Sequence, residues 1–283
     1  MPDAAGYHGH VTNHGDFRLS ITQALGDQLA DALDDLSPAP LTGPNLNELE
    51  DRPGVYQLYR NGKFVYVGKA DKSLPTRILK HLRKVSGRQD ISLSEMTFTC
   101  LYVAEDFSAL APEKLLIKNY KKRGEIPWNN NGFGNNDPGK RRDETVVKEN
   151  HFDALFRIDL GRTIPRITSG VTTLAKLLAH VSKEAPYTFR YEKKKMGTAY
   201  KKEIQVPETD LTVAQLFELI AINLPEEWQI TVLPGRAIMY PDNRRNYPSA
   251  WRYYRGGQVR DVEPEIGEAG EIPEEPDAVD DED

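Results

Sequence analysis

The stretch that decides the fold of the first half of the chain is PGVYQLYRNGKFVYVGKA, residues 53–70. Two runs rich in β-branched and aromatic residues flank Asn61-Gly62, a dipeptide that strongly favours a two-residue hairpin turn. We therefore predict a β-hairpin here. Side chains alternate between the two faces of a strand, and we expect this hairpin to present Tyr56 and Tyr66 on one face of a small sheet.

The segments around the hairpin predict the rest of a small α/β arrangement. Apolar residues at helical spacing predict a helix within residues 16–36. LPTRILKHLRK (74–84) predicts a helix opened by its proline, and MTFTCLYVA (96–104) predicts a strand. SALAPEKLLIKNYKK (108–122) predicts another helix, and a polar loop rich in Asn and Gly follows at 127–144.

The residue pattern restarts after HFDALFRIDL, residues 151–160. TTLAKLLAHVSK (172–183) and TVAQLFELIAINL (212–224) predict helices, while PYTFRYE, EWQITVL and AIMYP predict strands. A chain of 283 residues is long enough for two domains. We expect an α+β fold in four parts: a disordered N-terminus (1–15), a first domain with an N-terminal helix (16–151), a second α+β domain (152–260) and a disordered acidic tail (261–283).

The acidic tail masks a basic body. The formal net charge is −6, but residues 261–283 hold twelve of the 43 acidic residues and none of the 37 basic ones, so the preceding residues carry +6. A mildly basic body is compatible with a polyanionic partner. The tail itself is either a solubilising end or a mimic that competes with nucleic acid for the basic face.

Cysteine content and hydropathy argue against two classes of protein. The single cysteine, Cys100, cannot form an internal disulfide, and nothing indicates an oxidising compartment. No apolar stretch approaches the length that spans a bilayer, and the first residues lack the basic and apolar regions of a signal peptide. We therefore expect a cytoplasmic protein.

Several residues of the first domain suit phosphodiester hydrolysis if they converge. Arg77 and His81 lie four residues apart on one predicted helix and share a face, and a guanidinium matches phosphate geometry. Glu113 is a hard oxygen ligand for Mg²⁺. Gly68 lets the backbone approach another group, and Tyr56 is a phenol that nearby cations would make a usable base. Each residue alone has an ordinary structural reading, so the hypothesis rests on the combination.

The same residues resemble a known family. GVY at 54–56 and YVG at 66–68 resemble the paired motifs of the GIY-YIG nuclease superfamily. The resemblance covers roughly residues 16–158 and implies a short central antiparallel sheet flanked by helices. It assigns Tyr56 and Tyr66 to the tyrosines of the two motifs, Arg77 to the helix arginine, Glu113 to the metal-binding glutamate and Asn129 in PWN to the closing asparagine.

His81 and the flanking segments are similar to the restriction endonuclease branch in particular. Among known members, SPAPLTGPNL, YVGKA and FGNNDPGKRRDE followed by HFDALF look most like the subgroup that cuts CCGCGG. Residues 123–126, RGEI, lengthen the usual gap before Asn129, so that Asn130 or Asn131 could take its place. The second domain lies beyond the resemblance.

The resemblance implies a mechanism. Glu113 would hold one Mg²⁺ ion, with Mn²⁺ able to substitute. In one version Tyr56 activates the attacking water, and in the alternative His81 accepts the proton while Tyr56 only orients. The remaining roles are Lys69 and His81 poising Tyr56, Arg77 stabilising charge on phosphorus, Tyr66 positioning phosphate or water, and Asn129 supporting the site from behind. The products would carry 5′-phosphate and 3′-hydroxyl ends.

Cutting both strands of a short palindrome suits a two-fold homodimer on double-stranded DNA. Arg and Lys suit guanine, which fits a G·C-rich site. The candidate DNA-binding residues are Asn130, Asn131, Asn135, Asn136, Lys140, Arg141, Arg142, Lys193, Lys194 and Lys195. Phosphate contact or plain loop solvation are alternative readings of the loop, and dimer contacts are the alternative role of the second domain.

Three functions follow from these observations. The first is a type II restriction endonuclease, which would have a cognate DNA methyltransferase as its genetic partner. The second is a homing or repair nuclease of the same superfamily. The third is a DNA-binding protein whose nuclease module is inactive.

Overall fold

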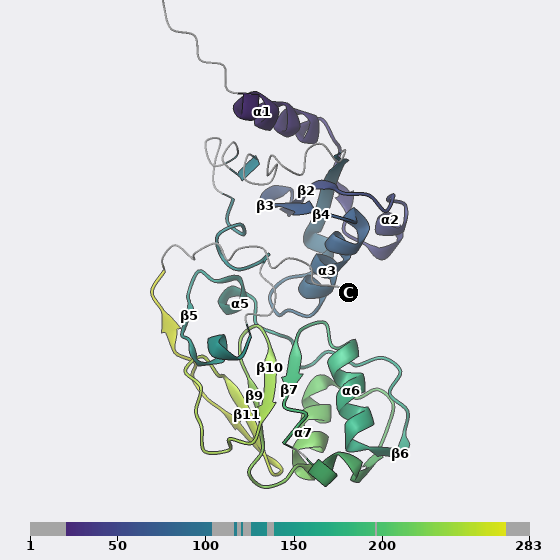
Figure 1. Ribbon diagram of the computed structural model, residues 1–283, viewed down its shortest axis with the longest axis vertical. Helices are drawn as coiled ribbons and strands as arrows, with labels where there is room; N and C mark the ends of the chain where they lie inside the picture. Colours follow the sequence, from purple (N-terminus) through teal and green to yellow (C-terminus); the bar gives the residue numbers. More distant parts are fainter. Residues whose placement is uncertain are drawn as a thin grey trace, which may run out of the picture.

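The chain forms a mixed α+β structure of two units stacked along the long axis of the molecule (Figure 1). The computed structural model describes residues 21–103, 116–117, 120, 126–134, 139–195 and 197–269. The predicted α+β class is confirmed. Within these residues no helix combines the length and the apolar character needed to cross a membrane.

The first unit is built on a four-stranded sheet in the order β1-β4-β2-β3, in which every pair is antiparallel. Its elements are α1 (Ile21–Asp34), β1 (Ala39–Pro40), α2 (Gly43–Asn47), β2 (Gly54–Arg60), β3 (Lys63–Ala70), α3 (Leu74–Ser86), the 3₁₀ turn η1 (Leu93–Glu95) and β4 (Met96–Tyr102). β2 and β3 form the predicted hairpin. Asn61 and Gly62 both take positive φ, 50° and 73°, as the favoured hairpin turn requires.

The two faces of this sheet are covered by different elements. Val55 and Val67 pack with α1 and with Leu116 on one face. Tyr56 and Tyr66 pack with α3 on the other. Figure 1 shows α1 and α3 on opposite sides of the strands. The alternation of a strand therefore separates a purely structural face from a face that carries both tyrosines.

The second unit is a five-stranded sheet in the order β12-β11-β9-β10-β7, in which only the β10–β7 pair is parallel. Its elements are β6 (Gly170–Thr173), α6 (Leu174–Glu184), β7 (Phe189–Tyr191), η4 (Gly197–Lys201), β8 (Glu203–Val206), α7 (Val213–Asn223), β9 (Gln229–Val232), β10 (Ala237–Tyr240), β11 (Arg252–Arg255) and β12 (Gln258–Asp261). β6 and β8 pair in a separate two-stranded sheet.

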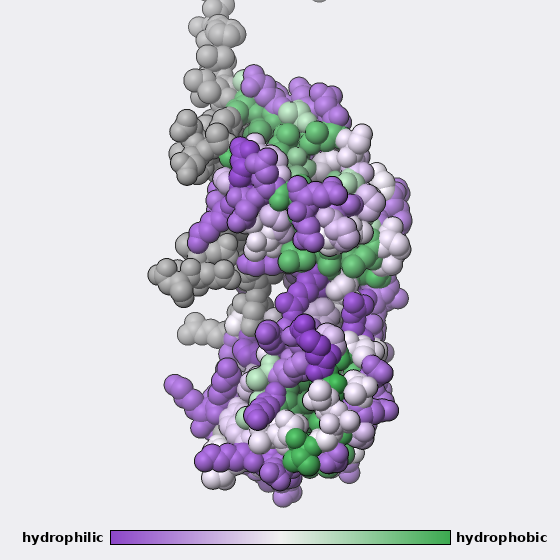
Figure 2. Space-filling view, turned by 90° about the vertical axis from the view of Figure 1, so that its right-hand side faces the viewer, coloured by the Kyte–Doolittle hydropathy of each residue, from purple (hydrophilic) through white to green (hydrophobic). Residues whose placement is uncertain are grey.

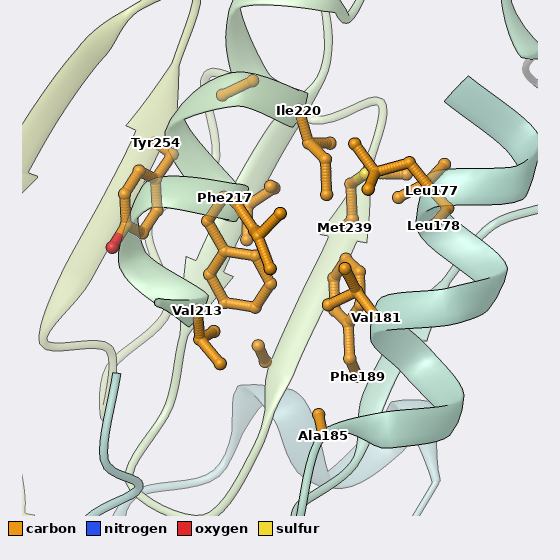
Figure 3. Close-up of a cluster of buried hydrophobic side chains, with 14 of the residues drawn as sticks. Leu177, Leu178, Val181, Ala185, Phe189, Val213, Phe217, Ile220, Met239 and Tyr254 are labelled. Atoms are coloured by element: carbon orange, nitrogen blue, oxygen red, sulfur yellow. The ribbon is translucent and has the colours of Figure 1, made fainter. Parts of the chain in front are cut away.

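The core of this unit lies between the sheet and two helices. Figure 3 shows Leu177, Leu178 and Val181 of α6 and Phe217 of α7 meeting beside the strands. Thr173 caps α6, because its side chain accepts the backbone N–H of Lys176. Thr212 caps α7 in the same way by accepting the backbone N–H of Gln215. On the surface, Figure 2 shows hydrophilic residues over much of both units and hydrophobic residues in smaller patches.

A short segment connects the units and contains η3 (Lys140–Glu144), β5 (Val147–Lys148) and α5 (Phe152–Leu155). The C-terminal segment returns to it. β13 (Ile266–Gly267) pairs in parallel with β5, and Ser249 Oγ donates to the carbonyl oxygens of Thr145 and Glu265. The predicted disordered tail therefore begins too early: residues 261–269 are ordered by strand pairing, which sequence charge does not reveal. Residues 270–283 and 1–20 lie outside the described residues.

The other predicted elements agree with the structure where it describes them. Helices predicted at 172–183 and 212–224 are α6 and α7, and the helix at 74–84 is α3. The helix predicted at 108–122 falls largely outside the described residues, although Leu116, Ile117 and Tyr120 are helical. No strand is predicted from sequence over β11 and β12.

Candidate active site

Tyr56 and Tyr66 lie side by side because of the hairpin register. Tyr56 is opposite Gly68, and Tyr66 is opposite Leu58, so the two tyrosines are diagonal neighbours on one face. Their ring centroids are 6.1 Å apart. Gly68 provides the space for this arrangement, since a Cβ atom there would lie 2.4 Å from Tyr56 Oη and 2.8 Å from a ring carbon of Tyr66. The sequence predicts that Gly68 lets the backbone approach another group closely, and in the structure that group is the Tyr56 side chain.

Replacing Gly68 with alanine is expected to displace both tyrosine rings. The added methyl overlaps the Tyr56 ring, and overpacking of this kind costs about 1–3 kcal/mol. Urea unfolding of Gly68→Ala measures the cost. Gly43→Ala is the matched control, because a Cβ at Gly43 meets no atom within 4 Å. Equal stabilities of the two variants would contradict the packing argument.

His81 completes the cluster from α3. Ser73 caps the start of α3 by accepting the backbone N–H of Thr76, and Pro75 occupies its first turn. The helical repeat then turns His81 inward with Ile78 and Val85. Tyr56 Oη and His81 Nε2 are 2.6 Å apart, and both side chains are buried.

The surroundings of His81 keep its imidazole neutral. Burial, followed by the nearby cations Arg77, Lys84 and Lys80, lowers the pKa of His81 well below its ordinary value. A neutral imidazole offers one nitrogen that accepts a proton. When Nε2 is that nitrogen, the Tyr56 hydroxyl donates a hydrogen bond to it. The phenol of Tyr56 is then in direct contact with a group that can accept its proton.

An aromatic residue that sequence reasoning missed covers this pair. The ring of Phe133 is stacked on His81, with centroids 4.8 Å apart and an interplanar angle of 17°. It meets Tyr66 edge-on at 5.0 Å. A Cβ atom on the next residue, Gly134, would lie 2.4 Å from Tyr66 Oη. The segment 126–134 therefore packs directly against the tyrosines and the histidine. In IPWNNNGFG the sequence analysis singles out asparagines and does not point to Phe133.

The side chain of Asn129 forms hydrogen bonds with the backbone of β3, the edge strand of the sheet. Its Oδ1 accepts the Val67 N–H at 2.9 Å, and its Nδ2 donates to the Val67 carbonyl at 2.7 Å. The Trp128 N–H adds a bond to the carbonyl of Val65. Asn129 thus extends the ladder of β3 and fixes the backbone between Tyr66 and Gly68.

The prediction that Lys69 poises Tyr56 is wrong in this structure. Lys69 is opposite Val55, and strand alternation sends its side chain to the Val55 face of the sheet, away from Tyr56. Its ammonium pairs with the carboxylate of Asp71. Arg77, by contrast, lies one helical turn before His81 and acts electrostatically on it.

The metal assignment falls outside the described residues, because these exclude Glu113. Among the side chains that the structure describes, no group of three or more His, Cys, Asp or Glu forms a metal cluster. Asn135, Asn136 and the side chain of Arg141 also lie outside the described part.

The remaining candidate DNA-binding residues divide into two groups. Asn131 is buried, its Oδ1 accepts the Phe133 N–H and its carbonyl accepts the Phe152 N–H, so the structure does not place it on the surface with the other candidates. Lys140 is exposed, with its ammonium 4.5 Å from the ring centroid of Tyr240. The other exposed members are Arg142, Lys193, Lys194 and Lys195, and Asn130 is partly buried.

Comparison with known proteins adds no assignment: no protein-family model matches the chain, and no curated protein matches it.

Proposed function

We propose that this protein is a site-specific endonuclease that hydrolyses phosphodiester bonds of double-stranded DNA, with a GIY-YIG-type site. The observation that carries the proposal is the 2.6 Å contact between Tyr56 Oη and the neutral His81 Nε2. It is supported by Tyr66 beside them and Arg77 one turn away on α3. A buried phenol paired with a neutral imidazole suits proton abstraction from water.

The chemistry of the pair balances without another base. Water loses a proton to Tyr56 Oη as the phenol passes its own proton to His81 Nε2, and the resulting hydroxide attacks phosphorus. The P–O3′ bond breaks as the new P–O bond forms, and the leaving 3′ oxygen takes a proton from solvent. Alternatively, His81 takes the proton directly and Tyr56 orients the water. In both versions Arg77 faces the charge that builds on the phosphoryl oxygens. Tyr66, whose hydroxyl lies on the same face, positions the phosphate or the water.

The proposed site would need a carboxylate to hold a magnesium ion. Mg²⁺ is commonly held by one or two carboxylates together with water and substrate phosphate. Phenol and imidazole groups dominate the described side chains of the site, so the carboxylate would come from Glu113. Mg²⁺, or Mn²⁺ in its place, would supply neutralisation of the phosphate charge.

Within this activity, the type II restriction class is the form that we propose. The flanking segments favour it, and a homodimer with one site per strand would cut both strands of a palindrome. The exposed Lys140, Arg142 and Lys193–Lys195 are available to phosphate or guanine. A cognate DNA methyltransferase would protect the host sites.

Digestion of unmethylated plasmid and phage DNA with Mg²⁺ tests the proposal. The wild type is expected to give discrete fragments that religate, as 5′-phosphate and 3′-hydroxyl ends do. Glu113→Ala is expected to bind DNA without cutting. Glu48→Ala, which removes an exposed carboxylate at the end of α2, is the matched control and should cut normally.

Other outcomes favour the other functions. Nicks or a smear would indicate a homing or repair nuclease. Binding without cleavage on every DNA would indicate an inactive nuclease module. Normal cleavage by Glu113→Ala would remove Glu113 from the metal site.

A further inference from the structure

A row of polar residues begins on α3 at the candidate site and continues past the C-cap of the helix, Gly87, to the junction between the units. Arg77, His81, Lys84 and Arg88 follow one another at spacings of four, three and four residues. Arg77 and His81 belong to the candidate site. The nuclease chemistry makes no use of Lys84 or Arg88, although both are held in specific contacts.

Lys84 holds the backbone of the segment that covers His81. Its ammonium donates to the carbonyl oxygens of Phe133 at 2.6 Å and of Gly132 at 3.4 Å. The same ammonium lies 5.5 Å from the ring centroid of Phe133 and 5.4 Å from that of Phe152. A single side chain of α3 therefore fixes both the main chain and the ring of Phe133.

Phe133 in turn fixes the imidazole. Its ring stacks on His81, while Trp128 and Phe152 hold it from the sides at centroid distances of 4.7 Å each. In its observed orientation His81 makes both the stack on Phe133 and the 2.6 Å contact with Tyr56. The position of Phe133 thus bears directly on the hydrogen bond of the Tyr56–His81 pair.

The other side of Lys84 faces a buried ion pair between the units. Arg88 pairs with Asp153 at 2.9 Å and donates to the carbonyl of Pro234 in the second unit. Burial by itself would raise the pKa of Asp153, but Arg88 and Lys84 hold it at about 2. Asp153 is therefore ionised at neutral pH, and it keeps a positive Lys84 at the junction.

We propose that Lys84 is a positioning residue for His81: by binding the main chain of Phe133 it keeps the phenylalanine ring stacked on the imidazole that accepts the Tyr56 proton. The inference rests on the proposed nuclease function for its catalytic meaning. The contacts that carry it stand without that function.

The electrostatics give the positioning role a measurable signature. His81 faces Tyr56 of β2, Tyr66 of β3 and the cations Arg77, Lys80 and Lys84 of its own helix. The segment above it contributes the uncharged ring of Phe133. Lys84 itself faces Asp153, Arg88 and Arg77, and burial lowers its pKa to about 8. Loss of Lys84 removes one cation and loosens the cover, and both changes raise the pKa of His81.

Nuclear magnetic resonance titration of the His81 ring tests the proposal in the full chain, with the signal assigned through His81→Asn. Lys84→Met removes the ammonium but keeps the side-chain stem. We expect it to raise the pKa of His81 and to change the ring-current shift from Phe133. Lys84→Arg should restore both values toward wild type. Lys80→Met is the matched control, because it also removes a cation that lowers the pKa of His81, but from the exposed side of α3.

The cleavage profile gives a second measurement. For Lys84→Met, the pH below which cleavage falls should be higher than in wild type, because a raised pKa of His81 lowers the neutral fraction of its imidazole in acid. Lys84→Gln, which keeps an N–H donor without charge, serves if Lys84→Met does not fold. Lys84→Gln should keep the ring-current shift from Phe133 closer to its wild-type value than it keeps the pKa of His81.

Each result decides the proposal. Equal shifts of the His81 titration in Lys84→Met and Lys80→Met, with an unchanged Phe133 ring current, would overturn it. A larger shift in Lys84→Met with rescue by Lys84→Arg would support it. The titration needs no DNA, so a wild-type protein that cuts nothing but shows this pattern would refute the nuclease function and leave the positioning contacts established.

Discussion

Tyr56→Phe is expected to slow DNA cleavage by about 10²- to 10⁴-fold, the usual contribution of a group that transfers a proton in the transition state. The substitution removes the hydroxyl that lies 2.6 Å from His81 Nε2 and keeps the ring that packs beside Tyr66. DNA binding should persist, because the phenol is buried in the DNA-free protein. Single-turnover cleavage with saturating enzyme measures the rate of the chemical step.

Tyr59→Phe is the matched control for this change. Tyr59 is on the same strand, and its hydroxyl donates to Gln57, away from His81. Its removal should leave the cleavage rate close to that of wild type. If Tyr56→Phe cuts as fast as Tyr59→Phe while His81→Asn is inactive, then His81 takes the proton from water directly and the version with a Tyr56 phenolate is wrong.

The pH dependence of cleavage follows from the state of His81. Its lowered pKa keeps Nε2 able to accept a proton well below pH 6.5, and acid should stop cleavage only when the imidazole becomes charged.

The hairpin and its tyrosines were predictable because their signals are local. Asn61-Gly62 specifies the turn, and the alternation on each side of it specifies the face. The face on which Lys69 lies follows from the same alternation. Lys69 is three residues after Tyr66, an odd number, and therefore lies on the opposite face of β3.

The cover of the site was not predictable from the sequence. Phe133 reaches His81 because residues 126–129 run along the edge strand β3 and Lys84 binds the chain that follows. These contacts join residues 49 or more positions apart, and no periodic pattern encodes them. The same holds for the pairing of β13 with β5, which ordered residues that charge alone assigned to a tail.

Asp143→Ala is expected to destabilise the second unit by about 3–5 kcal/mol, the cost of breaking a buried ion pair and leaving its partner charge uncompensated. Asp143 is buried at the end of η3 with 1% of its surface exposed. Both of its oxygens accept from Arg190, at 2.7 and 2.6 Å, and one also accepts from Arg236 at 2.8 Å. The variant would leave two guanidinium groups facing each other without an anion.

Asp261→Ala is the control that separates burial from the mere loss of an ion pair. Asp261 also binds an arginine, Arg252, through two contacts, but its side chain is 65% exposed. Exposed pairs contribute about 0–1 kcal/mol, so this variant should unfold at nearly the wild-type urea concentration. Similar losses in both variants would contradict the assignment of Asp143 as a buried anchor.

The anchor at Asp143 also has a consequence for DNA recognition. Asp143 belongs to the same 3₁₀ turn as Lys140 and Arg142, and its partners Arg190 and Arg236 belong to the second unit. The second unit therefore holds the segment that we expect to contact DNA. Asp143→Asn, which keeps the shape and one acceptor, should retain more stability than Asp143→Ala. If it still weakens cleavage at the cognate site more than binding to unrelated DNA, the second unit sets the register of readout; equal losses on both would limit it to general binding.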